Sequence, residues 1–391
     1  MKRYGKIIIG LVLLVSLAFL LSYCSSSSSS SPPATGTPSV GAGGSAANGA
    51  IQGATLSLSA MAGGNQSAPS FRKAKNLSDA AAKFYNVVRA KRANVLKAKA
   101  IPARTMYPCD SGTMTTDMMT SGTTTTSTHT YDNCIESYTD PDLGETVQTL
   151  TNGTIVFEDS GQSFSMKMGT STTPYYMKIT LLSTGTVFEE STATLTYTGV
   201  ADPTSAVTCS TAFGSSTEYA KMTITMDGNM HSKGTDESGV YDDTVVATAF
   251  KLDMTNTIDA ITCDMTGGTI EESGALSYTN NLDSSDNISM TISVATPVTM
   301  IWNSAPGGET STIAGTMNVA TSCFSGSLTL ATPTPMFFPS ETDCPTAGEV
   351  TVSGSVNGSV VYTSTGGVQI KDSSGAVVET YSSCDDIEVC S

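Results

Sequence analysis

Histidine often supplies catalytic or metal-binding groups in proteins, and this chain contains only two, His129 and His231. Metal centres and catalytic sites that need three imidazoles are therefore excluded. Neither histidine lies in a recognisable nucleophile motif. The chain also has no Gly-x-Ser-x-Gly elbow, no Gly-x-x-x-x-Gly-Lys loop and no His-Glu-x-x-His sequence. No enzyme class is predicted, and a hydrolase built from scattered acidic residues stays as the weakest alternative.

Methionine stands close to the second histidine. Met226 and Met230 precede His231, and thioether groups together with imidazole suit Cu(I). Met226 also alternates with Ile224 in a pattern typical of a strand that packs one face into a core, where methionine fills irregular gaps. We weigh a Cu(I) site at these residues against the core interpretation, which is the stronger of the two.

A short acidic segment offers oxygen ligands at alternate positions. Asp140 and Asp142 lie in Asp-Pro-Asp-Leu-Gly-Glu, which is similar to the start of a calcium loop. The segment lacks a third ligand and flanking helices, so a polar turn is the simpler interpretation. No resident cofactor is expected, and Ca²⁺ at these two residues remains the alternative.

Cysteine is frequent enough to staple the chain. The nine cysteines are Cys24, Cys109, Cys134, Cys209, Cys263, Cys323, Cys344, Cys384 and Cys390. No Cys-x-x-Cys occurs, so neither a zinc ribbon nor a thioredoxin-type site is indicated. If Cys24 is modified, eight thiols remain, an even number that is typical of disulfides in an exported protein. Eight cysteines allow 105 connectivities. We expect near neighbours to pair: 109 with 134, 209 with 263, 323 with 344, and 384 with 390.

The first 23 residues have the pattern of an export signal. Lys2, Arg3 and Lys6 precede an apolar run of signal-peptide length. Leu21-Ser22-Tyr23-Cys24 then resembles the cleavage site of bacterial lipoproteins, although Tyr23 stands where that family usually has Gly, Ala or Ser. The resemblance implies lipid attachment at Cys24. It also implies a membrane-anchored protein of the cell envelope, and the serine that follows Cys24 implies sorting to the outer membrane, on its periplasmic or surface face. The alternative is ordinary cleavage among the following serines.

Two further segments separate the signal from the rest of the chain. Residues 24–70 are Ser, Gly, Ala and Pro with few large side chains, which is typical of a disordered tether. Residues 71–104 carry ten basic side chains and one acid, and Leu77, Ala81, Phe84, Val88 and Val95 recur at helical spacing. One basic amphipathic helix is predicted there. It would either dock on the acidic remainder of the chain or lie on anionic lipid headgroups, unless it is simply a solvated linker.

From residue 105 to the C-terminus the pattern has period two. Apolar residues alternate with Thr or Ser over 164–168, 222–226 and 288–294, as in strands with one wet face. Asn152-Gly153 and Asp227-Gly228 are sequences typical of tight hairpins. About fifteen to twenty strands are expected. The predicted fold is mainly β: a large antiparallel meander, sandwich or half-barrel, stapled by disulfides and preceded by the basic helix.

The net charge of the chain restricts the kinds of partner that it is expected to bind. The chain has 19 Lys and Arg against 35 Asp and Glu, a formal charge of −16, and no polybasic surface suits nucleic acid as the partner. We expect an acidic, Thr- and Ser-rich, exported lipoprotein whose β domain binds an unidentified envelope partner or has a structural role. The alternative is a carrier that holds a lipid or another apolar ligand in a curved sheet.

Overall fold

The structure is a computed structural model that describes residues 104–383, apart from gaps at 141–144, 161, 212–213, 237–238, 263, 283–286, 322–323 and 340–344. The expected signal peptide, tether and basic helix lie outside the described residues. So do Cys24, Asp142 and five of the cysteines expected to form disulfides, namely Cys263, Cys323, Cys344, Cys384 and Cys390. In the part that is described, no helix is long and apolar enough to cross a membrane.

Strands make up most of the described chain, as the alternating pattern predicts. The first ten are β1 (Arg104–Pro108), β2 (Ser111–Ser121), β3 (Thr124–Asp140), β4 (Glu145–Asp159), β5 (Ser163–Met168), β6 (Tyr175–Leu181), β7 (Val187–Ala201), β8 (Ala206–Thr211), β9 (Gly214–Tyr219) and β10 (Lys221–Asp236). The second ten are β11 (Gly239–Ile258), β12 (Met265–Asn280), β13 (Ile288–Ile292), β14 (Val298–Ala305), β15 (Gly308–Thr321), β16 (Ser325–Pro339), β17 (Ala347–Gly354), β18 (Gly358–Tyr362), β19 (Val368–Asp372) and β20 (Val377–Tyr381). A single 3-10 turn, Pro203–Ser205, precedes β8 within the described residues.

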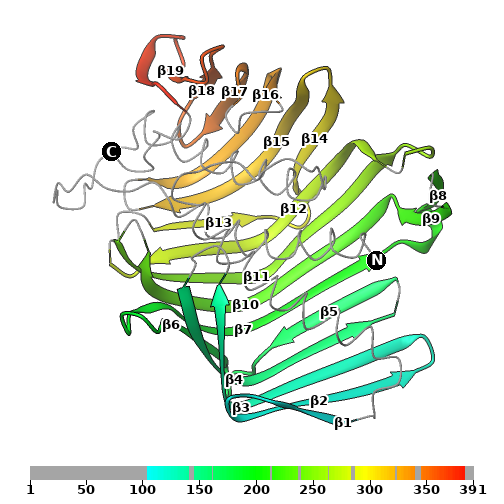
Figure 1. Cartoon of the computed structure of the whole chain (residues 1–391). Helices are drawn as coiled ribbons and strands as arrows, with labels where there is room; N and C mark the ends of the chain where they lie inside the picture. The colour runs from blue at the N-terminus through cyan, green and yellow to red at the C-terminus, as the bar shows by residue number, and fades with distance from the viewer. Residues whose placement is uncertain are drawn as a thin grey trace.

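Eighteen of these strands form one antiparallel sheet, which follows the chain as a meander. Figure 1 shows the strands crossing the molecule side by side in chain order, from β1 to the strands β16–β19 at the opposite end. The strands β8 and β9 form a separate hairpin between β7 and β10. The predicted antiparallel meander is therefore confirmed, and it is a single broad sheet.

The meander is interrupted in the same way at two places. One half of β4 pairs with β5 and the other half with β6, and both short strands then pair with β7. Likewise, the two halves of β12 pair with β13 and β14, and both pair with β15. At each of these two places, two short strands joined by a turn occupy the position of one long strand. The long strands on either side still follow one another in chain order.

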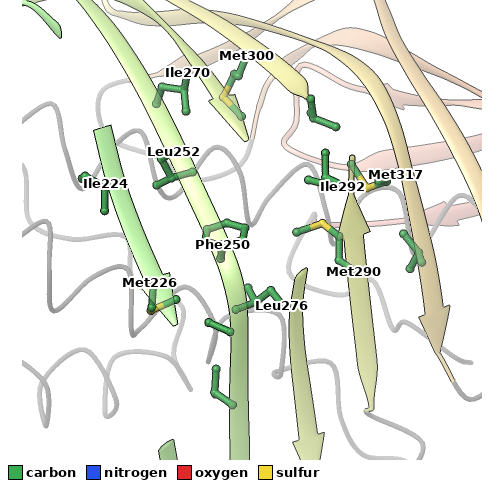
Figure 2. Close-up of a cluster of buried hydrophobic side chains, with 14 of the residues drawn as sticks. Ile224, Met226, Phe250, Leu252, Ile270, Leu276, Met290, Ile292, Met300 and Met317 are labelled. Atoms are coloured by element: carbon green, nitrogen blue, oxygen red, sulfur yellow. The ribbon is translucent and has the colours of Figure 1, made fainter. Parts of the chain in front are cut away.

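One face of the sheet, which we call the inner face, is apolar. Its buried side chains form a single hydrophobic cluster that extends from β4 to β19. Figure 2 shows part of it: Ile224 and Met226 of β10, Phe250 and Leu252 of β11, and Met290 and Ile292 of β13 gather on one side of their strands. Thr and Ser occupy most of the alternate positions, on the outer face. The expected stripe of methionine and aliphatic residues is therefore the core.

The two predicted hairpins at Asn152-Gly153 and Asp227-Gly228 are wrong, because both dipeptides lie inside long strands. Both glycines do have positive φ, 96° and 127°, which is the conformation that the dipeptide favours. At Asp227-Gly228 the pairing of β10 with β11 changes register. The positive φ that these dipeptides favour is therefore used at irregularities within strands and not in hairpin turns.

A disulfide links the start of the sheet to β3. Cys109 and Cys134 are bonded, with Cα atoms 5.4 Å apart and a sequence separation of 25 residues. This confirms one predicted pair. Cys209 on β8 is also disulfide-bonded, and its predicted partner lies outside the described residues.

Candidate functional site

The structure separates the residues of the expected Cu(I) site. Met226 is 3% exposed and belongs to the core, and Met230 packs against that core. His231 is the next residue along β10, so its side chain points to the outer face. There its Nε2 lies 2.8 Å from Oδ1 of Asp242. The two thioethers and the imidazole therefore do not converge on one site.

The other histidine is held between two hydroxyl groups. Nδ1 of His129 lies 3.0 Å from Oγ1 of Thr116, and Nε2 lies 2.8 Å from Oγ of Ser127. Its ring also meets Phe157 edge-on, with ring centroids 5.7 Å apart. A serine and a histidine thus lie at the distance that a nucleophile and a base require, but a threonine hydroxyl stands where a catalytic triad has a carboxylate. The two hydroxyl contacts and the Phe157 ring fix the orientation of the imidazole.

A group of charged side chains lies on the outer face of β6, β7, β10 and β11. Two adjacent rows cross these four strands in register. The first row is Tyr176, Thr192, His231 and Thr244; the second is Lys178, Glu190, Lys233 and Asp242. We call these eight residues the outer grid. Its second row alternates between positive and negative charge, so opposite charges face each other across every strand pair.

Direct contacts connect the members of the outer grid. Nζ of Lys233 lies 3.6 Å from Oε2 of Glu190, and the Tyr176 hydroxyl is hydrogen-bonded to the same carboxylate. Asn281, at the end of β12, donates from Nδ2 to Oδ1 of Asp242 at 2.6 Å. The side chains of Lys233 and His231 remain 46% and 38% exposed. The grid is therefore preorganised by its own contacts and accessible to a partner.

The carboxylate of Asp242 contacts both His231 and Asn281. Partial burial alone would raise its pKa. Hydrogen bonds from Asn281 and His231, together with the positive charges of His231 and Lys233, outweigh this effect and lower the pKa below its usual value. Asp242 is therefore an anion at neutral pH, and it can accept hydrogen bonds from a hydroxyl or an amine.

The same strands are also polar on the inner face, directly behind the grid. Ser191, Ser232 and Asp243 are 8%, 3% and 2% exposed and lie opposite one another across β7, β10 and β11. Oγ of Ser232 donates to Oε1 of Glu189 at 3.3 Å. Burial raises the pKa of Glu189, although hydrogen bonds from Ser232 and Ser191 oppose the shift. This is the part of the sheet where polar groups interrupt the apolar face.

Charge is distributed unequally between the two faces. All six lysines of the described sheet point outward, since each follows or precedes an inner-face residue: Lys167, Lys178, Lys221, Lys233, Lys251 and Lys371. Among the charged side chains that the structure describes in strands β2–β20, the inner positions hold only acids. The principal ones are Glu136, Glu189, Asp243, Glu272 and Glu309. The inner face is therefore apolar and acidic.

No metal centre is assembled in the described part of the chain, because nowhere in it do three or more His, Cys, Asp or Glu side chains converge as ligands. Asp140 is the last residue of β3, and its expected partner Asp142 lies outside the described residues. The structure thus adds no support to the Ca²⁺ alternative at these positions.

Sequence reasoning missed the outer grid. Its members come from four strands, from Tyr176 on β6 to Thr244 on β11, and only the strand register brings them together. One local signal was present: the segment from 227 to 243, which contains His231 and Asp242, is richer in charged residues than the Thr- and Ser-rich sequence around it. No protein-family model matches the chain, and no curated protein is significantly similar to it.

Proposed function

We propose that this chain is an exported lipoprotein, anchored by lipid at Cys24, whose outer grid binds a polar polymer of the cell envelope. The observation that carries the binding function is the alternating row Lys178, Glu190, Lys233 and Asp242 beside Tyr176 and His231. Hydroxyl, imidazole, carboxylate and ammonium groups in this arrangement complement a ligand that carries both hydroxyl groups and charges. A charged glycan has that chemistry.

The surroundings of the outer grid favour an extended ligand. Thr and Ser line the outer face beyond the grid, and several of their hydroxyls are paired across strands, as in Thr316 with Thr329 at 2.8 Å. A long polymer could exchange these hydrogen bonds for its own over many strands, each contributing a small amount. The flexible tether expected for residues 24–70 would let the sheet reach such a polymer away from the membrane.

Sedimentation with isolated envelope polysaccharide tests this function. The mature protein is mixed with insoluble peptidoglycan or with immobilised lipopolysaccharide, and the bound fraction is measured at low and high salt. Tyr176→Ala with His231→Ala should reduce binding at least tenfold, because an aromatic platform and a hydrogen-bonding ring are lost together. Ile261→Ala, which removes an exposed apolar side chain in the turn after β11, is the control. Equal binding by the two variants would refute a role of the outer grid.

A second candidate function is a carrier for an apolar ligand. It is favoured by the continuity of the inner apolar cluster from β4 to β19, because acyl chains bind surfaces lined by aliphatic and methionine side chains. Native mass spectrometry of protein purified without detergent tests it. A carrier would retain a lipid in addition to any chain attached at Cys24, and a protein that carries only the attached chain would exclude this function.

A further inference from the structure

The inner face of the sheet requires a covering layer. Leu252, Val298, Leu328 and Val360 are 0% exposed although they belong to four different strands of one sheet. Side chains on a sheet face are buried only when another layer, or the sheet itself, packs against them. The described residues supply one 18-stranded sheet and one two-stranded hairpin. The layer over the inner face therefore comes from the sheet itself or from another segment of the chain.

The charge of the inner face restricts what can cover it. Its charged positions are acids, such as Glu136, Glu189 and Glu309, and every lysine of the described sheet points the other way. Burial raises the pKa of Glu189 and of Glu309, and no positive charge of the described sheet counteracts either shift. An apolar surface with carboxyl groups along it is complementary to an amphipathic element with basic side chains.

The chain contains one segment with that composition, and it leads directly into the sheet. Residues 71–103 carry nine basic side chains and a single acid, Asp79. Leu77, Phe84, Val88 and Val95 would form one stripe if the segment is helical. The segment is joined to Arg104, the first residue of β1. Covalent attachment gives it an effective concentration on the order of millimolar at the sheet, so even modest affinity suffices for docking.

We propose that residues 71–103 dock on the inner face of the sheet, with their apolar stripe against the hydrophobic cluster and their lysines and arginines towards the inner-face carboxyls. The occupant is therefore the chain's own basic segment. A membrane surface would compete for this segment, and a bound lipid would compete for the inner face. In the docked arrangement the segment completes the core, and the outer face alone remains for binding.

The fluorescence of Trp302 reports directly on the covering layer. Trp302 is the only tryptophan of the chain, lies on β14 and is 2% exposed. Phe84→Asp places a charge within the apolar stripe, in the full mature chain produced without lipid. If the segment covers the inner face, Trp302 emission shifts to longer wavelength and its quenching by iodide rises severalfold. Asn86→Asp makes the same change of charge on the opposite side of a helix and should leave both unchanged.

Two further outcomes decide the proposal. Unchanged Trp302 emission in Phe84→Asp would overturn it, because the sheet itself or another segment of the chain would then supply the cover. If that variant fails to fold, carbodiimide cross-linking of the unaltered chain decides instead. Docking predicts amide links from lysines of 71–103 to Glu136, Glu189 or Glu309, whereas links confined to the outward-facing Glu158, Glu271 and Glu349 would refute it. Salt-reversible flotation with anionic vesicles, accompanied by no such inner-face links, would assign the segment to the membrane instead.

Discussion

The side chain of Asp227 accepts a hydrogen bond from the backbone N–H of Ala249 at 2.9 Å, across the pair β10–β11. Ala249 has φ 45° and lies where the register between these strands shifts. The same arrangement occurs near the start of the sheet, across the pair β3–β4. There Oδ1 of Asn152 accepts from the backbone N–H of Asn133 at 2.5 Å, and Asn133 has φ 46°. These are the only two non-glycine residues with positive φ in the described chain, and each is braced by an Asx-Gly dipeptide on the neighbouring strand.

Removal of the Asp227 side chain should destabilise the sheet. Asp227→Ala leaves the Ala249 N–H without its side-chain acceptor, and we expect the free energy of unfolding to fall by about 1 kcal/mol, the typical value of one hydrogen bond. Asp227→Asn keeps an acceptor oxygen and is the matched control. Urea unfolding followed by circular dichroism measures the difference. Equal midpoints for the two variants would show that the hydrogen bond between Asp227 and Ala249 does not stabilise the protein.

Glu272 should make the protein less stable as pH rises. It is 3% exposed, lies between Leu252 and Val298 in the sheet register, and burial raises its pKa to about 7. The unfolded carboxyl ionises near pH 4.5, whereas the folded one keeps its proton until about pH 7. The folded state therefore binds more protons in this window. Its stability falls by about 3 kcal/mol in total between these two pH values and is constant on either side.

The substitution Glu272→Gln should remove most of this pH dependence while conserving the shape of the side chain. Unfolding free energies at pH 4.5 and pH 8 are compared with those of Glu271→Gln, which changes the adjacent, outward-facing and exposed carboxyl. The Glu272→Gln protein is expected to gain stability over the unaltered protein at pH 8 and not at pH 4.5. Parallel pH profiles for the two variants would contradict the assigned burial of Glu272.

The disulfide between Cys109 and Cys134 should contribute measurably to stability. It closes a loop of 25 residues, for which the chain-entropy account gives about 3 kcal/mol. Replacement of both cysteines by serine should lower the urea midpoint accordingly, without changing the far-ultraviolet spectrum of the sheet. A double variant as stable as the parent would mean that β1 to β3 are held by strand pairing alone.

Ser127 should not behave as a catalytic nucleophile, despite its 2.8 Å contact with His129. The other ring nitrogen of His129 faces the Thr116 hydroxyl, which does not stabilise a positive imidazole as a carboxylate would. Incubation with a fluorophosphonate, followed by peptide mass spectrometry, should leave Ser127 unmodified. Stoichiometric labelling there, abolished by His129→Gln, would favour the hydrolase alternative.

Most of the fold could be predicted from the sequence, because a period of two in hydrophobicity is a local property. The runs at 164–168 and 222–226 and the first part of 288–294 lie in strands β5, β10 and β13. The buried apolar residues in them are Met166, Met168, Ile224, Met226, Met290 and Ile292. The hairpins at Asn152-Gly153 and Asp227-Gly228 failed for a physical reason. The dipeptide specifies positive φ, and a bulge within a sheet uses that conformation as well as a turn does. Only the pairing of neighbouring strands distinguishes the two.

The candidate site could not be predicted, because it depends on register across four strands. His231 and Asp242 are separated by 11 positions in sequence, and their meeting follows from the pairing of Lys233 with Asp242 and of His231 with Thr244. A shift of one residue would have turned His231 to the inner face, but it would have turned Met226 and Met230 to the outer face at the same time. Regular alternation along β10 places Met226 and Met230, four residues apart, on the inner face and His231 on the outer face.

The proposed export and anchoring of this chain are tested most directly by intact-mass spectrometry of the protein purified from its native cells. The account predicts a polypeptide that begins at Cys24, with the added mass of acyl chains on that residue. The remaining eight cysteines should be oxidised in pairs, including Cys109 with Cys134. A chain that retains Met1 and reacts fully with thiol reagents without prior reduction would contradict the account.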